Sequence, residues 1–478
     1  MIKDKFPSDA EKIRLDTYTE NQNIFSGQHY SAFSARRMAS GDTFKELQYI
    51  MTNFGGMLSK LSADMLFEEF PTFRFPDGDS DFLEAFMTAN RIKMQFYESA
   101  LENSYRGDVL LRLRSENGKL IAEDINPSCY FPRFNPMNVR ERPKATDLAW
   151  EVMLDVENKT KGVFVETHES GKITYSLHQL DEGGKVLNEL DPRNYDFLGV
   201  KELEVKTNID ELLVFHIKNF GVNSTYYGIS DYVDLKALMY AISKRMTRLD
   251  MILDKHGDPI LAVPEGVLDE NGKIKRESFG LIEVATGEGQ TAKPEYIVWD
   301  SKLESAFLEI ERLVEFLFLT SETTKSAFGL DKDGGVAESG RALKFKLLRT
   351  IAKKHRKELY YDAGLKDFLY TAQKFAKANK LECDGVKMTK DIVRPEIVWQ
   401  DGIINDAVEQ LEVEEKRLTN GLTTTEESIA RIDGITEAEA IDKKKKIQKE
   451  KKENQPDFLK NPFLNKNQDD GTDDNDNE

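Results

Sequence analysis

The sequence predicts an α+β protein, because the spacing of its apolar residues changes from helical to strand-like and back to helical along the chain. Within 43–67 and 81–103, apolar residues recur at the spacing of one helix face. Between residues 107 and 220 they alternate with polar residues, and from residue 231 onward the helical spacing returns. Helices are therefore expected on both sides of a central sheet region.

The first helix is expected to begin at the N-cap Asp42, and the pair Gly55-Gly56 predicts a kink inside it. The sheet region opens with 109–114 and 120–125, which the turn residues Asn117-Gly118 join into a predicted β-hairpin. Further strands are expected at 149–156, 162–167, 172–179 and 212–217. We therefore predict a mainly antiparallel sheet on which the earlier helices pack.

Two helices with a coiled-coil seam are the most distinctive prediction. Ser230 or Asp231 is expected to cap the first, over 231–255, and the second begins near Ser301. Apolar residues step by four and three along both helices, as in a coiled coil. The seam residues are Leu235, Met239, Ile242, Met246, Leu249 and Leu253 in the first helix, and Leu303, Phe307, Ile310, Val314 and Leu317 in the second. Such helices predict a structural subunit that associates with copies of itself.

Short apolar runs at 260–264, 281–285 and 296–299 predict a small β module between the two helices. A glycine-rich loop follows the second helix, and a long helix is then expected over 338–379, with a kink at Gly364. Three shorter helices follow, over 405–420, from Thr424 or Thr425, and from Thr436 to about Lys452. The Asn- and Asp-rich end of the chain is expected to be disordered.

The composition is that of a soluble globular protein, with 39% hydrophobic and 32% charged residues and a formal net charge of −18. The charged first residues predict no signal peptide, and the sequence lacks an apolar run long enough to span a membrane. Because Cys129 and Cys383 match no metal or redox spacing, we expect no disulfide framework and synthesis in a reducing cytoplasm.

No known catalytic motif occurs in the sequence. It has no phosphate-binding loop, no H-E-x-x-H motif and no nucleophile elbow. His168 and His178 flank a predicted hairpin and are interpreted as ordinary strand residues that could lie near each other. Asp331 and Asp333 lack the later glycine and glutamate of a calcium-binding loop. We therefore predict neither an enzyme nor a metal or cofactor site.

The order of elements resembles the portal proteins of tailed bacteriophages, specifically the group infecting Gram-positive hosts. Three strings carry the resemblance. They are 224–231 (STYYGISD), which resembles the family's turn into the first stem helix; 338–343 (ESGRAL), the start of the long helix; and 398–406 (VWQDGIIND) with 418–421 (LTNG), the passage into the crown. The resemblance extends over about residues 30–455.

The resemblance implies a portal fold with an α/β wing, a long-helix stem, a small β clip and a helical C-terminal crown. The implied ranges are 1–228 for the wing, 229–256 and 300–326 for the stem helices, 257–299 for the clip, 327–340 for the tunnel loop, 341–395 for the long helix returning to the wing, 396–455 for the crown and 456–478 for a disordered acidic tail. Such a subunit forms a ring, usually of twelve copies, at one capsid vertex of the virion. Double-stranded DNA passes through the channel, the terminase large subunit and a head-completion or adaptor protein dock at the clip, and scaffold and major capsid protein contact the wing.

The resemblance also implies site residues. The tunnel loop contains Phe328, Gly329, Leu330, Asp331, Lys332, Asp333, Gly334, Gly335 and Val336. The candidate DNA-facing residues of the stem are Lys244, Arg245, Arg248 and Lys255, for which a solvated face or an ion pair between subunits is the alternative. The candidate docking surface of the clip contains Leu268, Asp269, Glu270, Asn271 and Lys273.

The basic stretch Lys344, Lys346, Arg349, Lys353, Lys354, Arg356 and Lys357 is expected to pair mainly with acidic partners in the assembly. Two other functions stay open at this point. One is another ring-forming capsid or connector protein, although a long pair of stem helices speaks against a small connector. The other is a packaging enzyme, which the missing motifs disfavour.

Overall fold

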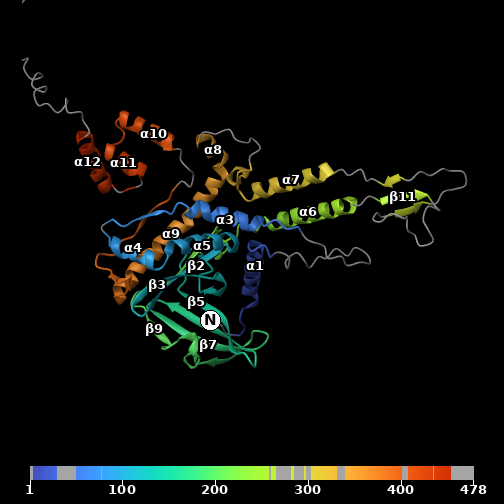
Figure 1. The fold of residues 1–478 in the computed structure, drawn as a ribbon. Helices are drawn as coiled ribbons and strands as arrows, with labels where there is room; N and C mark the ends of the chain where they lie inside the picture. Colours follow the sequence, from blue (N-terminus) through green and yellow to red (C-terminus); the bar gives the residue numbers. More distant parts are fainter. Residues whose placement is uncertain are drawn as a thin grey trace, which may run out of the picture. The chain divides into compact units, whose positions relative to one another are not determined.

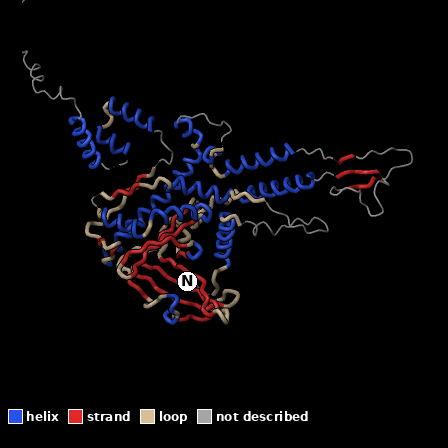
Figure 2. The backbone as a smooth tube through the Cα atoms, viewed as in Figure 1, coloured by secondary structure: helices blue, strands red, loops and turns tan. Residues whose placement is uncertain are grey.

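The computed structural model describes residues 4–28, 50–76, 78–257, 260–264, 281–284, 295–297, 303–330, 340–400, 407–433, 435 and 437–453 (Figure 1). The chain forms two compact units. The first contains Met1–Gly335 and Phe345–Gly402, and the second contains Val336–Lys344 and Ile403–Glu478. The predicted α+β class is confirmed, since helices and sheets both build the first unit (Figure 2).

In the described residues before the first long strand, the helices are α1 (Asp9–Phe25), α3 (Phe54–Phe67), α4 (Ser80–Ala89) and α5 (Ile92–Arg106). Helix α3 begins later than predicted, because the Asn53 side chain caps it by accepting a hydrogen bond from the Gly56 amide at 2.8 Å. The pair Gly55-Gly56 therefore lies in the first helical turn and makes no kink. A side chain at Gly56 would meet the carbonyl oxygen of Phe25 at 2.9 Å, which explains the glycine there. The predicted cap Asp42 lies outside the described residues.

The single helix predicted over 81–103 is wrong, since α4 and α5 are separate helices. Arg91 between them has a φ of 50°, which no α-helix contains. The side chain of Asn90 accepts from the Ala122 amide at 2.8 Å and donates to Phe86 at 2.9 Å. This polar residue ties the break to the adjacent sheet.

The first sheet has the order β10-β2-β3-β14-β15, with β2 (Asp108–Glu116), β3 (Lys119–Ile125), β10 (Val214–Lys218), β14 (Glu382–Cys383) and β15 (Val386–Lys387). The predicted hairpin is confirmed, because Asn117 and Gly118 both have positive φ and β2 pairs antiparallel with β3. Helices α3, α4, α5 and α9 supply the other half of its core, which includes Phe82, Phe86, Phe96, Leu111 and Phe368.

The second sheet has the order β4-β5-β6-β7-β8, and β9 pairs with β7. Its strands are β4 (Tyr130–Pro132), β5 (Ala145–Asp155), β6 (Thr160–Glu169), β7 (Lys172–Leu180), β8 (Val186–Leu190) and β9 (Glu204–Lys206). Short 3₁₀ helices lie at η1 (Pro127–Cys129), η2 (Pro192–Asn194) and η3 (Asp196–Leu198). All strand pairs of this sheet are antiparallel, as predicted.

The long helical segment predicted over 338–379 is divided at Leu347 into α8 (Gly340–Lys346) and α9 (Leu348–Asn379). Helix α9 has 32 residues and continues through Gly364, where a kink was predicted. The glycine has a packing role instead, because a side chain there would meet Cγ1 of buried Ile217 in β10 at 2.5 Å. The close approach of α9 to β10 therefore requires a glycine at position 364.

We expect Gly364→Ala to lower the free energy of unfolding by about 1–3 kcal/mol, because it overpacks the helix–sheet contact. Helix propensity alone would give the opposite sign, since Ala favours a helix over Gly by about 1 kcal/mol. Denaturant unfolding measures the change. Combined with Ile217→Ala, the substitution should cost less than the two single changes together; strict additivity would contradict this explanation.

The stem hairpin consists of α6 (Lys236–Gly257) and α7 (Leu303–Thr320), which lie side by side (Figure 1). Between them in the sequence are β11 (Ile260–Pro264), β12 (Leu281–Val284) and β13 (Glu295–Ile297), which form one sheet in the order β12-β11-β13. The β module is confirmed in these three strands. Both helices are shorter than predicted: α6 starts after Asp231 instead of at it, and α7 ends at Thr320.

The short 3₁₀ helix η4 (Lys325–Phe328) follows α7. The strand β16 (Glu396–Val398) follows α9 and pairs antiparallel with β1 (Thr72–Arg74). The range 396–455 predicted for the crown therefore begins with a strand that belongs to the first unit. The second unit contains α10 (Ala407–Thr419), α11 (Thr425–Asp433) and α12 (Glu437–Glu453). Thr424 caps α11 as predicted, accepting from the Glu427 amide at 3.2 Å.

Among the described residues, no helix is both long and apolar enough to cross a membrane.

Candidate functional site

The two stem helices pack through the predicted seam. Leu235, Met239, Ile242 and Leu249 are buried, and Leu317 of α7 lies in one hydrophobic cluster with the first three. Two predicted seam residues, Leu253 and Phe307, are instead exposed. The sequence pattern therefore located the contact between the helices but extended it too far toward the ends that adjoin β11 and β13.

The candidate DNA-facing residues of the stem have different surroundings. Arg245 forms an ion pair with Glu309 of α7, with 2.8 Å between Nε and Oε1. The ammonium of Lys244 lies 5.8 Å from the centre of the Tyr240 ring, and Arg248 is half-buried. The side chain of Lys255 lies outside the described residues. Arg245 therefore has a partner within its own chain, whereas the predicted alternative was an ion pair between subunits.

Asp231, at the foot of the stem, is held by four side chains. Lys357 donates to Oδ2 at 2.6 Å and Ser104 to the same oxygen at 2.7 Å. Lys353 lies 3.2 Å from Oδ1, and Asn219 donates to Oδ1 at 3.1 Å. Burial alone would raise the pKa of Asp231, but the charges of Lys353 and Lys357 outweigh it and hold the pKa well below its ordinary value.

The chain leaving α7 at the base of the stem reaches the same helix. Glu322, just after α7, has a φ of 57° and contacts Arg349 at 3.4 Å and also Arg356. Lys353 donates to the Ser321 carbonyl at 3.0 Å. Burial would raise the pKa of Glu322, but the hydrogen bond and charge of Arg356 lower it. Both ends of the hairpin are therefore fastened to the first turns of α9, an arrangement that we call the stem clamp.

The basic stretch thus has partners inside the chain. Sequence reasoning expected them mainly in other molecules of the assembly and missed Asp231 and Glu322. The spacing could have indicated a shared acidic partner, because Arg349, Lys353, Arg356 and Lys357 lie on one face of a helix. In the same stretch Lys354 pairs with Glu358 at 3.2 Å and donates to the Gln400 carbonyl.

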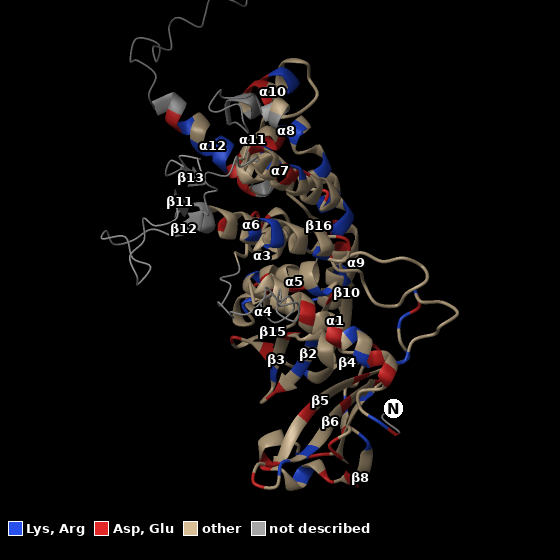
Figure 3. Ribbon diagram, turned by 90° about the vertical axis from the view of Figure 1, so that its right-hand side faces the viewer, with Lys and Arg blue, Asp and Glu red and all other residues tan. Residues whose placement is uncertain are grey.

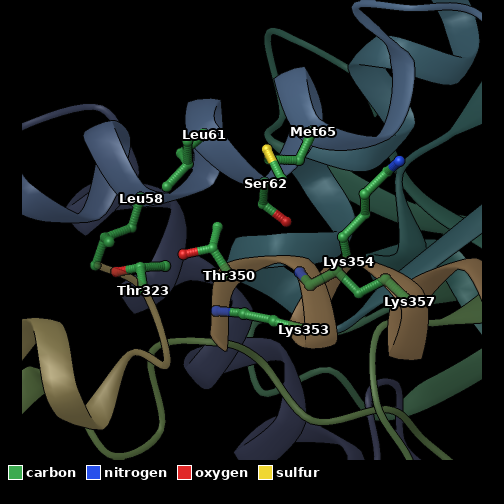
Figure 4. Close-up of a pocket in the computed structure, with 9 residues that line it drawn as sticks. All are labelled: Leu58, Leu61, Ser62, Met65, Thr323, Thr350, Lys353, Lys354 and Lys357. Atoms are coloured by element: carbon green, nitrogen blue, oxygen red, sulfur yellow. The ribbon is translucent and has the colours of Figure 1, made fainter. Parts of the chain in front are cut away.

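Two hollows lie at the stem clamp. The smaller, of about 20 Å³, lies between α3 and α9 and is lined by Leu58, Leu61, Ser62, Met65, Thr323, Thr350, Lys353, Lys354 and Lys357 (Figure 4). Its volume is close to what one water molecule needs, so it is not a site for a larger ligand. The larger, an open cleft of about 370 Å³, is lined by Val233, Leu319, Glu322, Arg349, Arg356 and their neighbours.

The pKa of Asp231 gives a prediction for acid unfolding. Its folded pKa is lower than the unfolded value of about 3.9, so the unfolded chain binds more protons between the two. The stabilisation is fully present above pH 4 and is lost as the pH falls through the folded pKa. We therefore expect Asp231→Asn to cost much less stability in acid than at pH 7, as measured by unfolding at both pH values. An equal cost at both would contradict the ionised clamp.

The start of the tunnel loop belongs to the stem. The Phe328 ring lies 5.4 Å from that of Phe318 in α7, so this end of the predicted loop packs on the stem helix. Gly329 has a φ of 67° and Leu330 is exposed. The other loop residues, Asp331 to Val336, lie outside the described residues, and so do the clip residues Leu268, Asp269, Glu270, Asn271 and Lys273.

The scattered histidines form no site in the described part of the chain. His168 contacts Glu166 at 2.6 Å, whereas His178 pairs with Val163 toward the other end of the β6–β7 ladder. The two do not lie near each other, because His168 faces Ile173 in the same register. No group of three or more His, Cys, Asp or Glu residues with metal-binding geometry occurs among the described residues.

Comparison with known proteins identifies the family. The family model described as phage portal protein, SPP1 Gp6-like, matches residues 187–457. No curated protein matches the chain. Similar chains occur in solved structures of the virion of a native gene transfer agent particle and of its neck with C12 symmetry, each with 12% identity, 80% of this chain and 89% of that chain covered, and a TM-score of 0.43. A chain in the neck of the empty particle, with C6 symmetry, has 11% identity, with 80% of this chain and 90% of that chain covered and a TM-score of 0.43.

Likeness to those particles at this level is too weak to decide fold or function. The family match decides, because it extends over more than half of the residues and includes the stem hairpin, α9 and the helices α10, α11 and α12. The chain belongs to the phage portal protein family.

Proposed function

We propose that copies of this portal subunit close into a ring of about twelve at one vertex of a phage capsid, and that double-stranded DNA passes through the ring during packaging and ejection. As a member of the portal family, the chain is a structural protein and not an enzyme. The observation that best supports a ring is that the two stem helices have opposite net charge.

Helix α6 has five basic and two acidic residues, whereas α7 has one basic and four acidic residues (Figure 3). Within the hairpin, Arg245 of α6 and Glu309 of α7 form an ion pair that links the two helices. A ring needs two different, complementary faces on each subunit. The basic side of α6 in one copy and the acidic side of α7 in the next supply such faces, and their attraction favours closure in one direction.

Exposed apolar residues on α7 support the same contact. Leu313, Val314 and Leu317 pack toward α6, while Leu308 and Phe316 on the other side are exposed to solvent. A stripe of large apolar residues on the free side of a helix is typical of a protein interface. The hairpin therefore has a face that is suited to a neighbouring copy.

The channel function rests on the family and on charge. With a net charge of −18, the chain has little bulk attraction for DNA, so a duplex can slide without being held. Because Lys244 and Arg248 are assigned to the contact between copies, Lys255 on the same helix is left as the candidate stem residue for contact with phosphates. Each tight phosphate contact would add to a salt-dependent grip, and sparse cations avoid this.

The remaining partners stay predictions of the portal assignment. The terminase large subunit and a head-completion or adaptor protein are expected at the clip, residues 257–299. Scaffold and major capsid protein are expected at the wing. The virion is the expected location, with synthesis in the cytoplasm of a bacterial host of the Gram-positive group.

A mixing experiment tests the charged contact. Variant A carries Lys244→Glu and Arg248→Glu, so that both its stem faces are acidic. Variant B carries Glu304→Lys and Glu311→Lys, so that both are basic. We expect each variant alone to remain small in mass photometry, because like charges meet at every contact. An equimolar mixture should form rings in which A and B alternate.

Unchanged rings from either variant alone would overturn the charged contact. Failure of the wild-type chain to form rings at any concentration would overturn the portal ring itself.

A further inference from the structure

A second exposed apolar stripe lies on α9. Its members share one side of the helix and are exposed: Leu348, Ala352, His355, Leu359 and Ala363. The two leucines are 61% and 72% exposed, far more than a leucine that packs inside its own subunit. Ala352 and His355 stand between the two leucines, and the small side chain of Ala352 leaves room beside Leu348 for a side chain of another helix. We call this set the α9 stripe.

The stripe starts at the stem clamp. Arg349 and Arg356 of the same turns line the open cleft together with Leu319 of α7. Leu319 is 69% exposed, and with Phe316 it ends the outward apolar face of α7 next to the wing. The free end of α7 and the first turns of α9 therefore lie at the same level of the subunit, because Glu322 joins them.

Rotation about a ring axis moves every residue to the same level of the next subunit. The Phe316–Leu319 end of α7 in one copy is therefore brought to the level of the first turns of α9 in its neighbour. We propose that this end of α7 docks on the α9 stripe of the neighbouring copy, with Leu348 and Leu359 as its principal contacts. The inference rests on the proposed ring and adds a specific second contact at the stem base.

Charge agrees with this pairing. Residues 348–357 contain five Lys or Arg and no acidic residue, and Arg349 remains 67% exposed despite its contact with Glu322. Helix α7 is net acidic. A basic, leucine-bearing helix against an acidic, leucine-bearing helix gives electrostatic as well as apolar complementarity. A second copy of this chain supplies such a helix at the required level.

Cysteine cross-linking tests the contact directly, because the chain has only two cysteines. Both Cys129 and Cys383 are buried, and burial raises the pKa of each thiol to about 12, so neither competes in mild oxidation. Preformed rings carrying Leu319→Cys with Leu348→Cys are oxidised and run on a denaturing, non-reducing gel. Leu319→Cys alone and Val156→Cys with Leu348→Cys are the controls, since Val156 is exposed at the β5–β6 turn.

We expect the Leu319–Leu348 pair to give a ladder of covalent dimers, trimers and higher species, and the controls to stay monomeric. Rings without a ladder would overturn the α9 contact and leave the ring intact. A faster monomer band, from a bond within one chain, would show that α7 covers its own α9 and would also overturn it. Absence of rings before oxidation would instead count against the proposed function.

A surface substitution gives a second readout. Leu359→Asp should leave the unfolding of the monomer almost unchanged, because the side chain is exposed, but should reduce the fraction of chains in rings at least tenfold. Val156→Asp is the matched control and should assemble as the wild type does. Equal assembly of both variants would contradict the inference.

Discussion

Replacing Asp231 by Asn is expected to lower the free energy of unfolding by about 3 kcal/mol at pH 7. The substitution leaves Lys353 and Lys357, whose side chains are nearly buried, without their shared counter-charge. Uncompensated buried charges cost far more than a lost surface ion pair. Urea unfolding followed by circular dichroism measures the loss.

Asp234→Asn is the matched control, because Asp234 lies three residues further on and is exposed. It should change stability by less than about 0.5 kcal/mol. The triple variant D231N/K353M/K357M should regain part of the loss, since it removes the stranded charges as well. A triple variant less stable than the single one would mean that the clamp stabilises mainly through its hydrogen bonds.

Replacing Gly228 by Ala is expected to cost about 3 kcal/mol or more, the second large effect. Gly228 lies in the turn into the stem, and a side chain there would stand 2.0 Å from the Gly107 carbonyl oxygen. That oxygen already accepts from the Asn219 amide at 2.8 Å, and the Gly228 amide donates to Asp108 at 2.7 Å. The turn therefore has no room to shift without breaking these bonds.

Gly385→Ala is the control for backbone conformation. Gly385 has a φ of 80° but no atom within 4 Å of an added side chain. Its substitution should cost only the strain of a left-handed residue, about 1–2 kcal/mol. Thermal unfolding of both variants measures the difference, and equal losses would show that crowding at Gly228 is unimportant.

The sequence predicted those parts of the fold whose causes are local. The hairpin at Asn117-Gly118 needs two positive φ angles, and these residue types supply them. The seam of α6 and the capping of α11 by Thr424 also follow from residue spacing and type. Local patterns were misleading where a contact distant in the sequence determines the residue. Gly364 is an example, because the glycine is required by close packing on Ile217 of β10 and does not mark a kink.

The candidate site was harder to predict for the same reason. The basic stretch of α9 was visible in the sequence, but one acidic partner, Asp231, stands 122 residues before Lys353 and 126 before Lys357, and the other, Glu322, lies across a loop. Pairing of this kind depends on the tertiary fold and leaves no periodic signal. Phe328 is similar, because its packing on Phe318 depends on how the chain turns after α7. The stem helices could thus be predicted from the sequence, but the ion pairs that join them to α9 could not.

Electron microscopy of the purified wild-type chain, with its mass measured in solution, tests the central claim most directly. The account predicts closed rings with an open centre, one rotational symmetry and a mass near twelve times 54.7 kDa. Particles that remain monomeric at high concentration, or open filaments that never close, would contradict it.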